Sequence, residues 1–150
     1  MNTLCVVPCG KSKIWDKHPN AGPTQAKDVY TGPFASSCRQ YAQAFYPGAW
    51  VILSAKHGFL LPDDRVRGPY EVSFNDPNTH PISSAELGRQ AKAKGLDKYD
   101  QIVAIAGANY AKRIREALPG KPVRTPLAGA SGMGTMMAKL KAAVGARRPL

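Results

Sequence analysis

The stretch WVILSAKHGFLLPDD, residues 50–64, joins an apolar run to a group of polar residues. Residues 50–53 form a continuous apolar run, which predicts a strand buried on both faces. Polar groups follow at once, and Gly58 permits a sharp turn among them. They are a hydroxyl, an amine, an imidazole and two carboxylates: Ser54, Lys56, His57, Asp63 and Asp64. Because ligands bind beyond the carboxyl ends of strands in open α/β sheets, this order predicts a site directly after the strand.

The rest of the chain repeats the alternation of buried strand and amphipathic helix. Further strands are predicted at TLCVVP, QIVAIAG and, more weakly, PVRTPL, which are residues 3–8, 101–107 and 122–127. Helices are predicted at residues 33–45, 111–118 and 133–144, where apolar residues recur at helical spacing. A further helix is predicted at residues 83–94, because Ser83 and Glu86 form a capping-box pattern at its start. The sequence therefore predicts an α/β fold: a single three-layer domain over residues 1–150, with a four-stranded parallel sheet and helices on both faces.

The charge of the chain is unusual, although its apolar content of 43% is ordinary for a globular protein. Twenty-one Lys and Arg residues oppose ten Asp and Glu residues, which gives a formal net charge of +11. Such a field concentrates polyanions near the surface, and nucleic acid is the commonest polyanion. We therefore expect a nucleic acid or a nucleotide as the partner. The alternative is a basic protein whose charge serves only solubility.

The three cysteines, Cys5, Cys9 and Cys38, cannot all pair with one another, and no Cys or His cluster has the spacing of a zinc site. We expect reduced thiols in a cytoplasmic protein, with no metal and no cofactor. MNTLCVVPCG has no basic start, and its apolar run is too short for a signal peptide. No apolar stretch is long enough to span a bilayer, so no membrane partner is expected.

Four polar loops should meet at the carboxyl edge of the sheet: CGKSK, SAKHG, GANY and LAGASGMG. In the first loop, a glycine lets backbone N–H groups turn toward an anion, and the neighbouring side chains add donors. The candidate binding residues there are Cys9, Gly10, Lys11, Ser12 and Lys13. The loop lacks the second glycine of a Walker A motif. A solvated basic turn is the competing interpretation.

The second loop and the segment after it supply the other polar candidates. Ser54, Lys56 and His57 can face the crevice, and we expect the last two to donate to a phosphate or a departing base. His57 is therefore a catalytic candidate together with Asp63 and Glu71, whereas Ser54 and Lys56 are binding candidates. No Ser-His-Asp order supports a hydrolase triad. Asp63 or Glu71 would act as a general base or stabilise a cationic sugar, with Tyr70 as a neighbouring binding residue. The alternative for these carboxylates is a surface loop in ion pairs with nearby arginines.

Two further regions complete the predicted site. Tyr30 lies at a loop–helix junction, where its ring would stack on a base or, equally, pack against the helix. Gly129 and Ser131 lie in the glycine-rich loop before the last helix, which predicts close backbone approach to an anion. Tight packing of helix against sheet is the alternative for that loop.

The motifs PCGKSK, DVYTGPF, ILSAKHGFLLPDD with PYE, and PLAGASGMGTMMAKLK resemble a family of small, uncharacterised bacterial and phage domains. The likeness covers nearly the whole chain, and SAKHGFL is its most specific part. That family is in turn similar, more remotely, to the uracil-DNA-glycosylase-like α/β fold and to domains of tRNA deazaguanine modification. The resemblance implies nucleobase or N-glycosidic chemistry. The Gln-Asp-Pro-Tyr and His-Pro-Ser motifs of uracil-DNA glycosylases are absent, so no catalytic residue is carried over.

The sequence thus favours a DNA-glycosylase-like enzyme that processes a nucleobase or an N-glycosidic bond in a nucleic acid or a nucleotide. The first loop would grip a phosphate, Tyr30 and the 54–58 loop would hold a base, and Asp63 or Glu71 would face the sugar. The alternative is a non-catalytic domain that binds nucleic acid or senses a nucleotide through the same basic crevice. The oligomeric state is left open.

Overall fold

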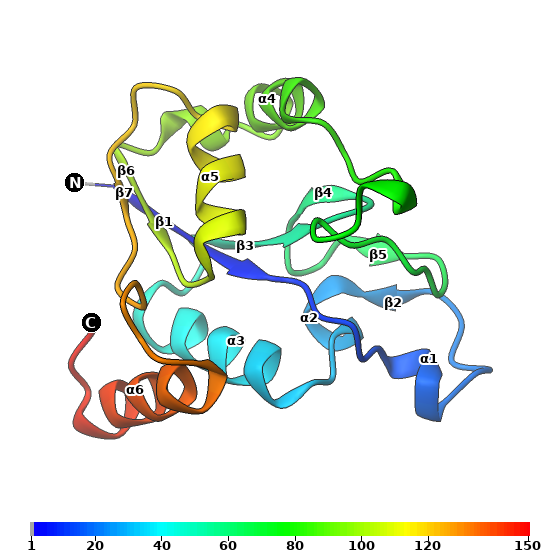
Figure 1. Ribbon diagram of the computed structural model, residues 1–150, viewed down its shortest axis with the longest axis horizontal. Coiled ribbons are helices and arrows are strands. Elements are labelled where there is room, and N and C mark those ends of the chain that lie inside the picture. Colours follow the sequence, from blue (N-terminus) through cyan, green and yellow to red (C-terminus); the bar gives the residue numbers. More distant parts are fainter. Residues whose placement is uncertain (1) are drawn as a thin grey trace.

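The computed structural model describes residues 2–150, and a five-stranded sheet with the order β4-β3-β1-β6-β7 forms its centre (Figure 1). Four strands run parallel: β1 (Thr3–Pro8), β3 (Trp50–Ser54), β6 (Gln101–Ala104) and β7 (Val123–Arg124). The fifth strand, β4 (Gly58–Leu60), pairs with β3 in the antiparallel direction. The α/β class predicted from the sequence is confirmed.

The number and direction of the strands differ from the four-stranded parallel sheet that the sequence predicts. The chain reverses directly after β3, because Gly58 has a φ of +75° and pairs with Ser54 across the turn. Residues 58–60 therefore add a short edge strand where a loop was expected. β7 is only two residues long. Pro122 and Pro126 flank it and lack the N–H groups that would extend the ladder.

Helices cover both faces of the sheet (Figure 1). α3 (Pro33–Phe45) packs against α6 (Met133–Ala146), and α4 (Ser84–Ala93) packs against α5 (Ala108–Ala117). Alternate residues of β1 face the two layers: Cys5 joins the core that contains Tyr41 and Leu140, whereas Leu4 joins the core that contains Leu87 and Ile114. The expected layers of helices on both faces are therefore present.

Local sequence signals account for the helix starts. Ser83 Oγ accepts a hydrogen bond from the backbone N–H of Glu86 at 3.1 Å, so this pair caps α4 as predicted. Pro33 occupies the first turn of α3, where its missing N–H is no loss. Among the described residues, no helix is both long and apolar enough to cross a membrane.

Short elements extend the carboxyl edge of the sheet beyond β1 and β3 (Figure 1). α1 (Ile14–Lys17) and α2 (Ala26–Val29) follow β1, and β2 (Thr24–Gln25) pairs antiparallel with β5 (Arg65–Val66) in a separate ribbon. The chain also contains two 3₁₀ turns: η1 (Pro77–Thr79) precedes α4, and η2 (Leu96–Lys98) precedes β6. The ribbon joins the two segments in which most of the predicted polar candidates lie.

Candidate functional site

The carboxyl ends of β1 and β3 bring the first two polar loops together, as the sequence predicts. The backbone N–H of Cys9 donates to the carbonyl of Leu53 at 3.2 Å, which ties the start of the first loop to the end of β3. Lys13 Nζ lies 4.5 Å from the centre of the Tyr70 ring. The backbone of Lys13 also forms an isolated bridge with Tyr30. Three segments distant in sequence therefore meet at one point.

A chain of hydroxyl groups links these segments. The Tyr70 hydroxyl forms hydrogen bonds with the Tyr30 hydroxyl and, at 2.7 Å, with Ser54 Oγ. Ser54 Oγ also accepts from the backbone N–H groups of Lys56 and His57, at 3.3 and 3.0 Å. All three hydroxyl-bearing residues are buried. Ser54 thus fixes the turn that carries Lys56 and His57, and the Tyr30 ring packs in the core rather than facing a ligand.

Burial keeps the two phenols neutral. Burial is the main cause that raises the pKa of Tyr70 to about 12, with a smaller contribution from Cys9. Burial also raises the pKa of Tyr30 far above its usual value, and the neighbouring Tyr70 adds to this shift. Both hydroxyls therefore act as hydrogen-bond donors and acceptors, not as bases, at neutral pH.

Two ammonium groups lie over the Tyr70 ring. Lys13 Nζ donates to the carbonyl of Lys11 at 3.1 Å, and Lys56 Nζ lies 5.7 Å from the centre of the ring. Burial lowers the pKa of Lys13, whereas Cys9, Asp16 and Glu71 act in the opposite direction. Lys13 is buried, while Lys11 and Ser12 are exposed to solvent. The first loop therefore divides its side chains between the interior of the cluster and the surface.

A pocket of about 300 Å³ opens beside this cluster, and we call it the basic pocket. Its lining residues are Lys56, His57, Arg65, Arg67, Gly68 and Pro69, so no lining residue is acidic. The edge of the His57 ring packs on Tyr70, with ring centres 5.0 Å apart. Burial, and then the positive charge of Lys56, lower the pKa of His57. The lining brings positively charged groups close together, and a bound anion would reduce the repulsion between them.

The third polar loop reaches the same region through a residue that was not among the predicted site residues. The Tyr110 hydroxyl lies 3.2 Å from Cys9 Sγ, at hydrogen-bond distance. The Tyr110 ring meets Phe74 edge to face, with centres 5.3 Å apart. Arg113 lies 4.3 Å above the Phe74 ring, and its buried Nε has no hydrogen-bond partner among residues 2–150. The GANY motif already indicated Tyr110, but nothing local to Arg113 indicates its contact with Phe74.

The two candidate carboxylates lie in different surroundings. Glu71 is exposed and directly follows Tyr70 in the chain, which places its backbone at the cluster, and its charge raises the pKa of Lys13. Asp63 forms a 3.0 Å ion pair with Lys27, and its side chain is 77% exposed. Asp63 lines a second pocket of about 490 Å³, which also includes Trp50. The structure therefore brings Glu71, but not Asp63, to the tyrosine cluster.

The remaining candidates lie outside the basic pocket. Gly129 and Ser131 are exposed, and the Ser131 hydroxyl forms its hydrogen bond with Thr135 at 3.0 Å. Gly10 lies against α3, where an added Cβ would be 3.6 Å from Ala35. Within residues 2–150 there is no group of three or more His, Cys, Asp or Glu residues that could hold a metal ion.

Comparison with known proteins places the chain in a family. Residues 4–142 match a family model described as "Family of unknown function (DUF6884)". The chain belongs to this family. It is also 42% identical over 146 residues to the uncharacterized protein YfjM of Bacillus subtilis (strain 168), with 96% of each chain covered. Membership in an uncharacterised family, as expected from the motifs, is confirmed.

The DUF6884 match spans the basic pocket and the tyrosine cluster, because every residue of both lies between residues 4 and 142. The tail residues Arg147 and Arg148 lie beyond the matched span. No solved structure matches the chain. The remote likeness to the uracil-DNA-glycosylase-like fold therefore stays a prediction.

Proposed function

We propose that this protein binds a nucleotide or a nucleic acid by holding a phosphate group in the basic pocket. The observation that carries this proposal is the lining of the pocket, in which Lys56, His57, Arg65 and Arg67 surround a space of about 300 Å³ with no carboxylate among them. Guanidinium groups bind phosphate through paired, charge-assisted hydrogen bonds. The volume lies at the lower end of the range for small-molecule sites.

The position of the pocket supports the same function. It borders the turn after β3, at the edge of the sheet where α/β proteins bind their ligands. Ser54 holds the backbone of this turn before any ligand arrives, so Lys56 and His57 lose little freedom on binding. The His57 ring and Pro69 supply flat apolar surface beside the cations, on which a base can stack. The chain's net charge of +11 favours the approach of an anion.

The test compares thymidine 5′-monophosphate with thymidine by calorimetric titration. We expect the nucleotide to bind and the nucleoside to bind at least tenfold more weakly, because one charge-assisted contact is worth about 1.5–3 kcal/mol. Arg67→Ala should weaken nucleotide binding about tenfold or more for the same reason. The matched control is Lys92→Ala, which removes an exposed charge on α4, outside the pocket.

Sulfate titrations at several pH values add a second readout. A bound anion favours protonated His57, so sulfate affinity should rise as the pH falls through the lowered pKa of this residue. Equal binding of nucleotide and nucleoside, or equal losses in the Arg67→Ala and Lys92→Ala variants, would rule out the pocket as the phosphate site.

Hydrolysis of an N-glycosidic bond is the second candidate function, and the position of Glu71 favours it. Cleavage of this bond builds positive charge on the sugar and negative charge on the departing base, while water adds to the anomeric carbon and gives its proton to the base. Glu71 lies near Lys13, so charges of both signs stand at one edge of the sheet. The resemblance to the uracil-DNA-glycosylase-like fold supports the same chemistry.

Matched carboxylate variants test this second function on oligonucleotides that each contain one modified base. For a glycosylase, Glu71→Gln should lower base release about 100-fold or more. Asp63→Asn serves as the control, because Asp63 pairs with Lys27 away from the cluster. Absence of base release from every substrate would leave phosphate binding as the function and remove the catalytic one. A loss in Asp63→Asn alone would transfer the catalytic role to the second pocket.

A further inference from the structure

The positive charge of the chain is concentrated in its last third. Residues 108–150 contain nine of the 21 Lys and Arg residues but one of the ten Asp and Glu residues. This segment therefore carries a net charge of +8, out of +11 for the whole chain. The basic pocket, by contrast, is lined by residues 56–69. Most of the excess charge thus lies outside the proposed phosphate site.

The cations of this segment have no acidic partners within the described part of the chain. The three ion pairs among residues 2–150 are Lys27–Asp63, Arg89–Glu86 and Lys94–Asp64, all of them earlier in the sequence. Seven of the nine cations are exposed: Lys112, Arg115, Arg124, Lys139, Lys141, Arg147 and Arg148. None of these seven cations takes part in an ion pair within the described residues, so they are available to an external polyanion.

The fold gathers part of these cations at the β7 end of the molecule. Arg124 in β7 donates to the carbonyl of Leu150 at 3.1 Å, and the backbone N–H of Leu150 donates to Tyr41 at 2.9 Å. These contacts hold the C-terminal tail beside the sheet. We define the C-terminal basic surface as the exposed cations of β7, α6 and this tail: Arg124, Lys139, Lys141, Arg147 and Arg148.

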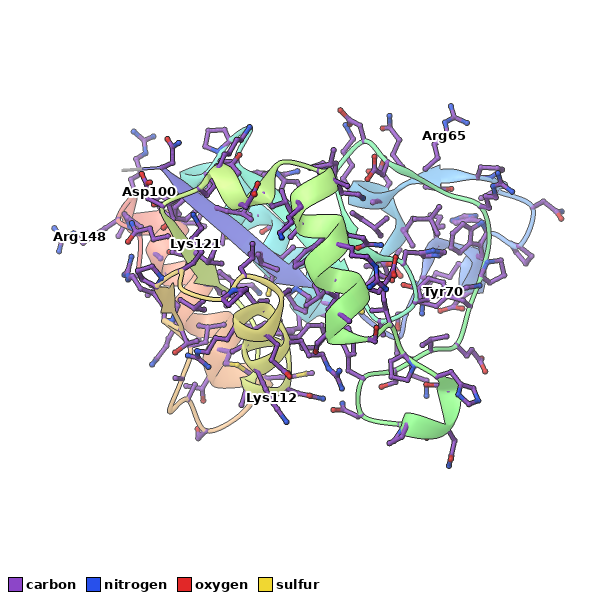
Figure 2. All side chains as sticks on the ribbon, turned by 90° about the horizontal axis from the view of Figure 1, so that it is seen from above. Arg65, Tyr70, Asp100, Lys112, Lys121 and Arg148 are labelled. Carbon is purple, nitrogen blue, oxygen red and sulfur yellow. The ribbon has the colours of Figure 1, made fainter. Side chains whose placement is uncertain are left out.

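Figure 2 shows that Arg148 of this surface and Arg65 of the basic pocket lie toward opposite ends of the molecule. Arg148 projects from one end, whereas Arg65 and Tyr70 lie toward the other. Asp100 also lies at the Arg148 end, where its carboxylate accepts a hydrogen bond from the backbone N–H of Asn2 at 3.1 Å. A protein of this length is about 40 Å across. A single nucleotide bound in the pocket cannot reach the second surface.

We infer that the ligand is a nucleic-acid polymer of about ten nucleotides or more, whose backbone contacts the C-terminal basic surface while one phosphate occupies the basic pocket. This inference rests on the proposed function of the pocket and decides between its two ligand classes. A polymer presents regularly spaced charges over tens of ångströms, which fits exposed and unpaired cations distributed over β7, α6 and the tail. A free nucleotide uses none of them.

The experiment measures the binding of thymidine 5′-monophosphate and of single-stranded oligothymidylates of 4 and 20 nucleotides over a range of salt. We expect the 20-mer to bind at least tenfold more tightly than the 4-mer. The double variant Lys139→Ala/Lys141→Ala should weaken 20-mer binding at least fivefold and reduce the salt slope by about 1.4, because each single-strand phosphate contact contributes about 0.7. Monophosphate affinity should not change in this variant.

A matched double variant controls for net charge. Lys17→Ala/Lys92→Ala removes two exposed cations outside both sites and should leave the salt slope within about 0.5 of the wild-type value. Equal binding of the two oligomers, or equal effects of the two double variants, would overturn the inference. The proposed function of the pocket is tested independently of this inference: it is wrong if Arg67→Ala leaves monophosphate binding unchanged. The 20-mer is also measured as a duplex. Duplex binding that is tighter than single-strand binding and is unchanged in Lys139→Ala/Lys141→Ala would also count against the inference.

Discussion

The turn at residues 54–58 and the loop at residues 127–134 both follow a strand of the sheet, and each depends on a glycine with positive φ, +75° at Gly58 and +84° at Gly129. Their surroundings differ. A Cβ on Gly58 would lie 2.0 Å from the side-chain oxygen of Gln90, whereas nothing lies within 4 Å of the corresponding position on Gly129. A glycine turn thus becomes rigid through side chains that are distant in sequence, here that of Gln90.

Gln90 is the residue that creates this difference. Its side-chain amide accepts from the backbone N–H of Phe59 and donates to the carbonyl of His57, each at 2.9 Å. Ser54 holds the inner side of the same turn. The backbone that carries Lys56 and His57 is thus held by hydrogen bonds from both Ser54 and Gln90. A ligand at Gly129 would instead have to order an open loop, at a cost in conformational entropy.

The largest expected effect comes from alanine at Gly58, with alanine at Gly129 as the comparison. Gly58→Ala should lower the free energy of unfolding by about 3 kcal/mol, because the left-handed conformation costs about 1–2 kcal/mol and displacement of Gln90 breaks two hydrogen bonds. Gly129→Ala should cost only about 1 kcal/mol, since its surroundings are open. Urea denaturation measures both. Equal losses would mean that Gln90 does not hold the turn.

Removal of Gln90 tests the same contact from the other partner. Gln90→Ala leaves the Phe59 N–H and the His57 carbonyl without their partner and should cost about 2 kcal/mol. The neighbouring Arg89→Ala is the control: it breaks only an exposed ion pair with Glu86 and should cost under about 1 kcal/mol. A similar stability for both variants in urea would show that water replaces the amide without loss.

Tyr70→Phe removes the hydroxyl that joins Tyr30 to Ser54 and should cost about 1–1.5 kcal/mol at neutral pH. The raised pKa of Tyr70, about 12 against a usual value of 10, adds a pH dependence. Between these values the unfolded chain loses a proton that the folded chain keeps, so stability falls as the pH rises from 10 to 12. The fall should be smaller in Tyr70→Phe when unfolding is followed over this range. A parallel decline in both proteins would place the titration elsewhere.

The smallest effect is expected in the open loop. Ser131→Ala should change stability by less than about 0.5 kcal/mol, because Ser131 is exposed and bonds only with the nearby Thr135. Nucleotide affinity should stay at the wild-type value. A tenfold loss of affinity in calorimetric titration would bring this loop into the site and remove the distinction between the two turns.

The parts of the fold that local sequence controls were predictable. The apolar run before Ser54 and the pairing of Ser83 with Glu86 gave the strand and the helix start, because both depend on residues near one another in the chain. β4 was missed, since a three-residue strand has too little pattern and forms through its pairing with β3. The ribbon of β2 and β5 joins Thr24 to Val66, a contact that no local pattern indicates.

The candidate site, like the fold, was predictable from the sequence only in part. The polar loops were expected at the carboxyl edge, and Lys56 and His57 do line a pocket there. The sequence could not distinguish Asp63 from Glu71, because the ion pair of Asp63 depends on Lys27, far back in the chain. Nor could it show that Tyr30 packs inward, since its hydroxyl partner Tyr70 comes forty residues later. Long-range packing decides which polar groups face a ligand.

The contacts around β4 also bear on self-association. An edge strand with free N–H and carbonyl groups is a template for another chain, and growth of such contacts leads to aggregation. Here Gln90 and Lys94 occupy the outward groups of Phe59, and Asp64 occupies the N–H and, through its own backbone N–H, the carbonyl of Leu61. The outward side of β4 therefore presents no open hydrogen-bonding ladder from Phe59 to Leu61. Gln90, which fixes the turn, thus also helps to keep this edge of the sheet from pairing with a second copy of the chain.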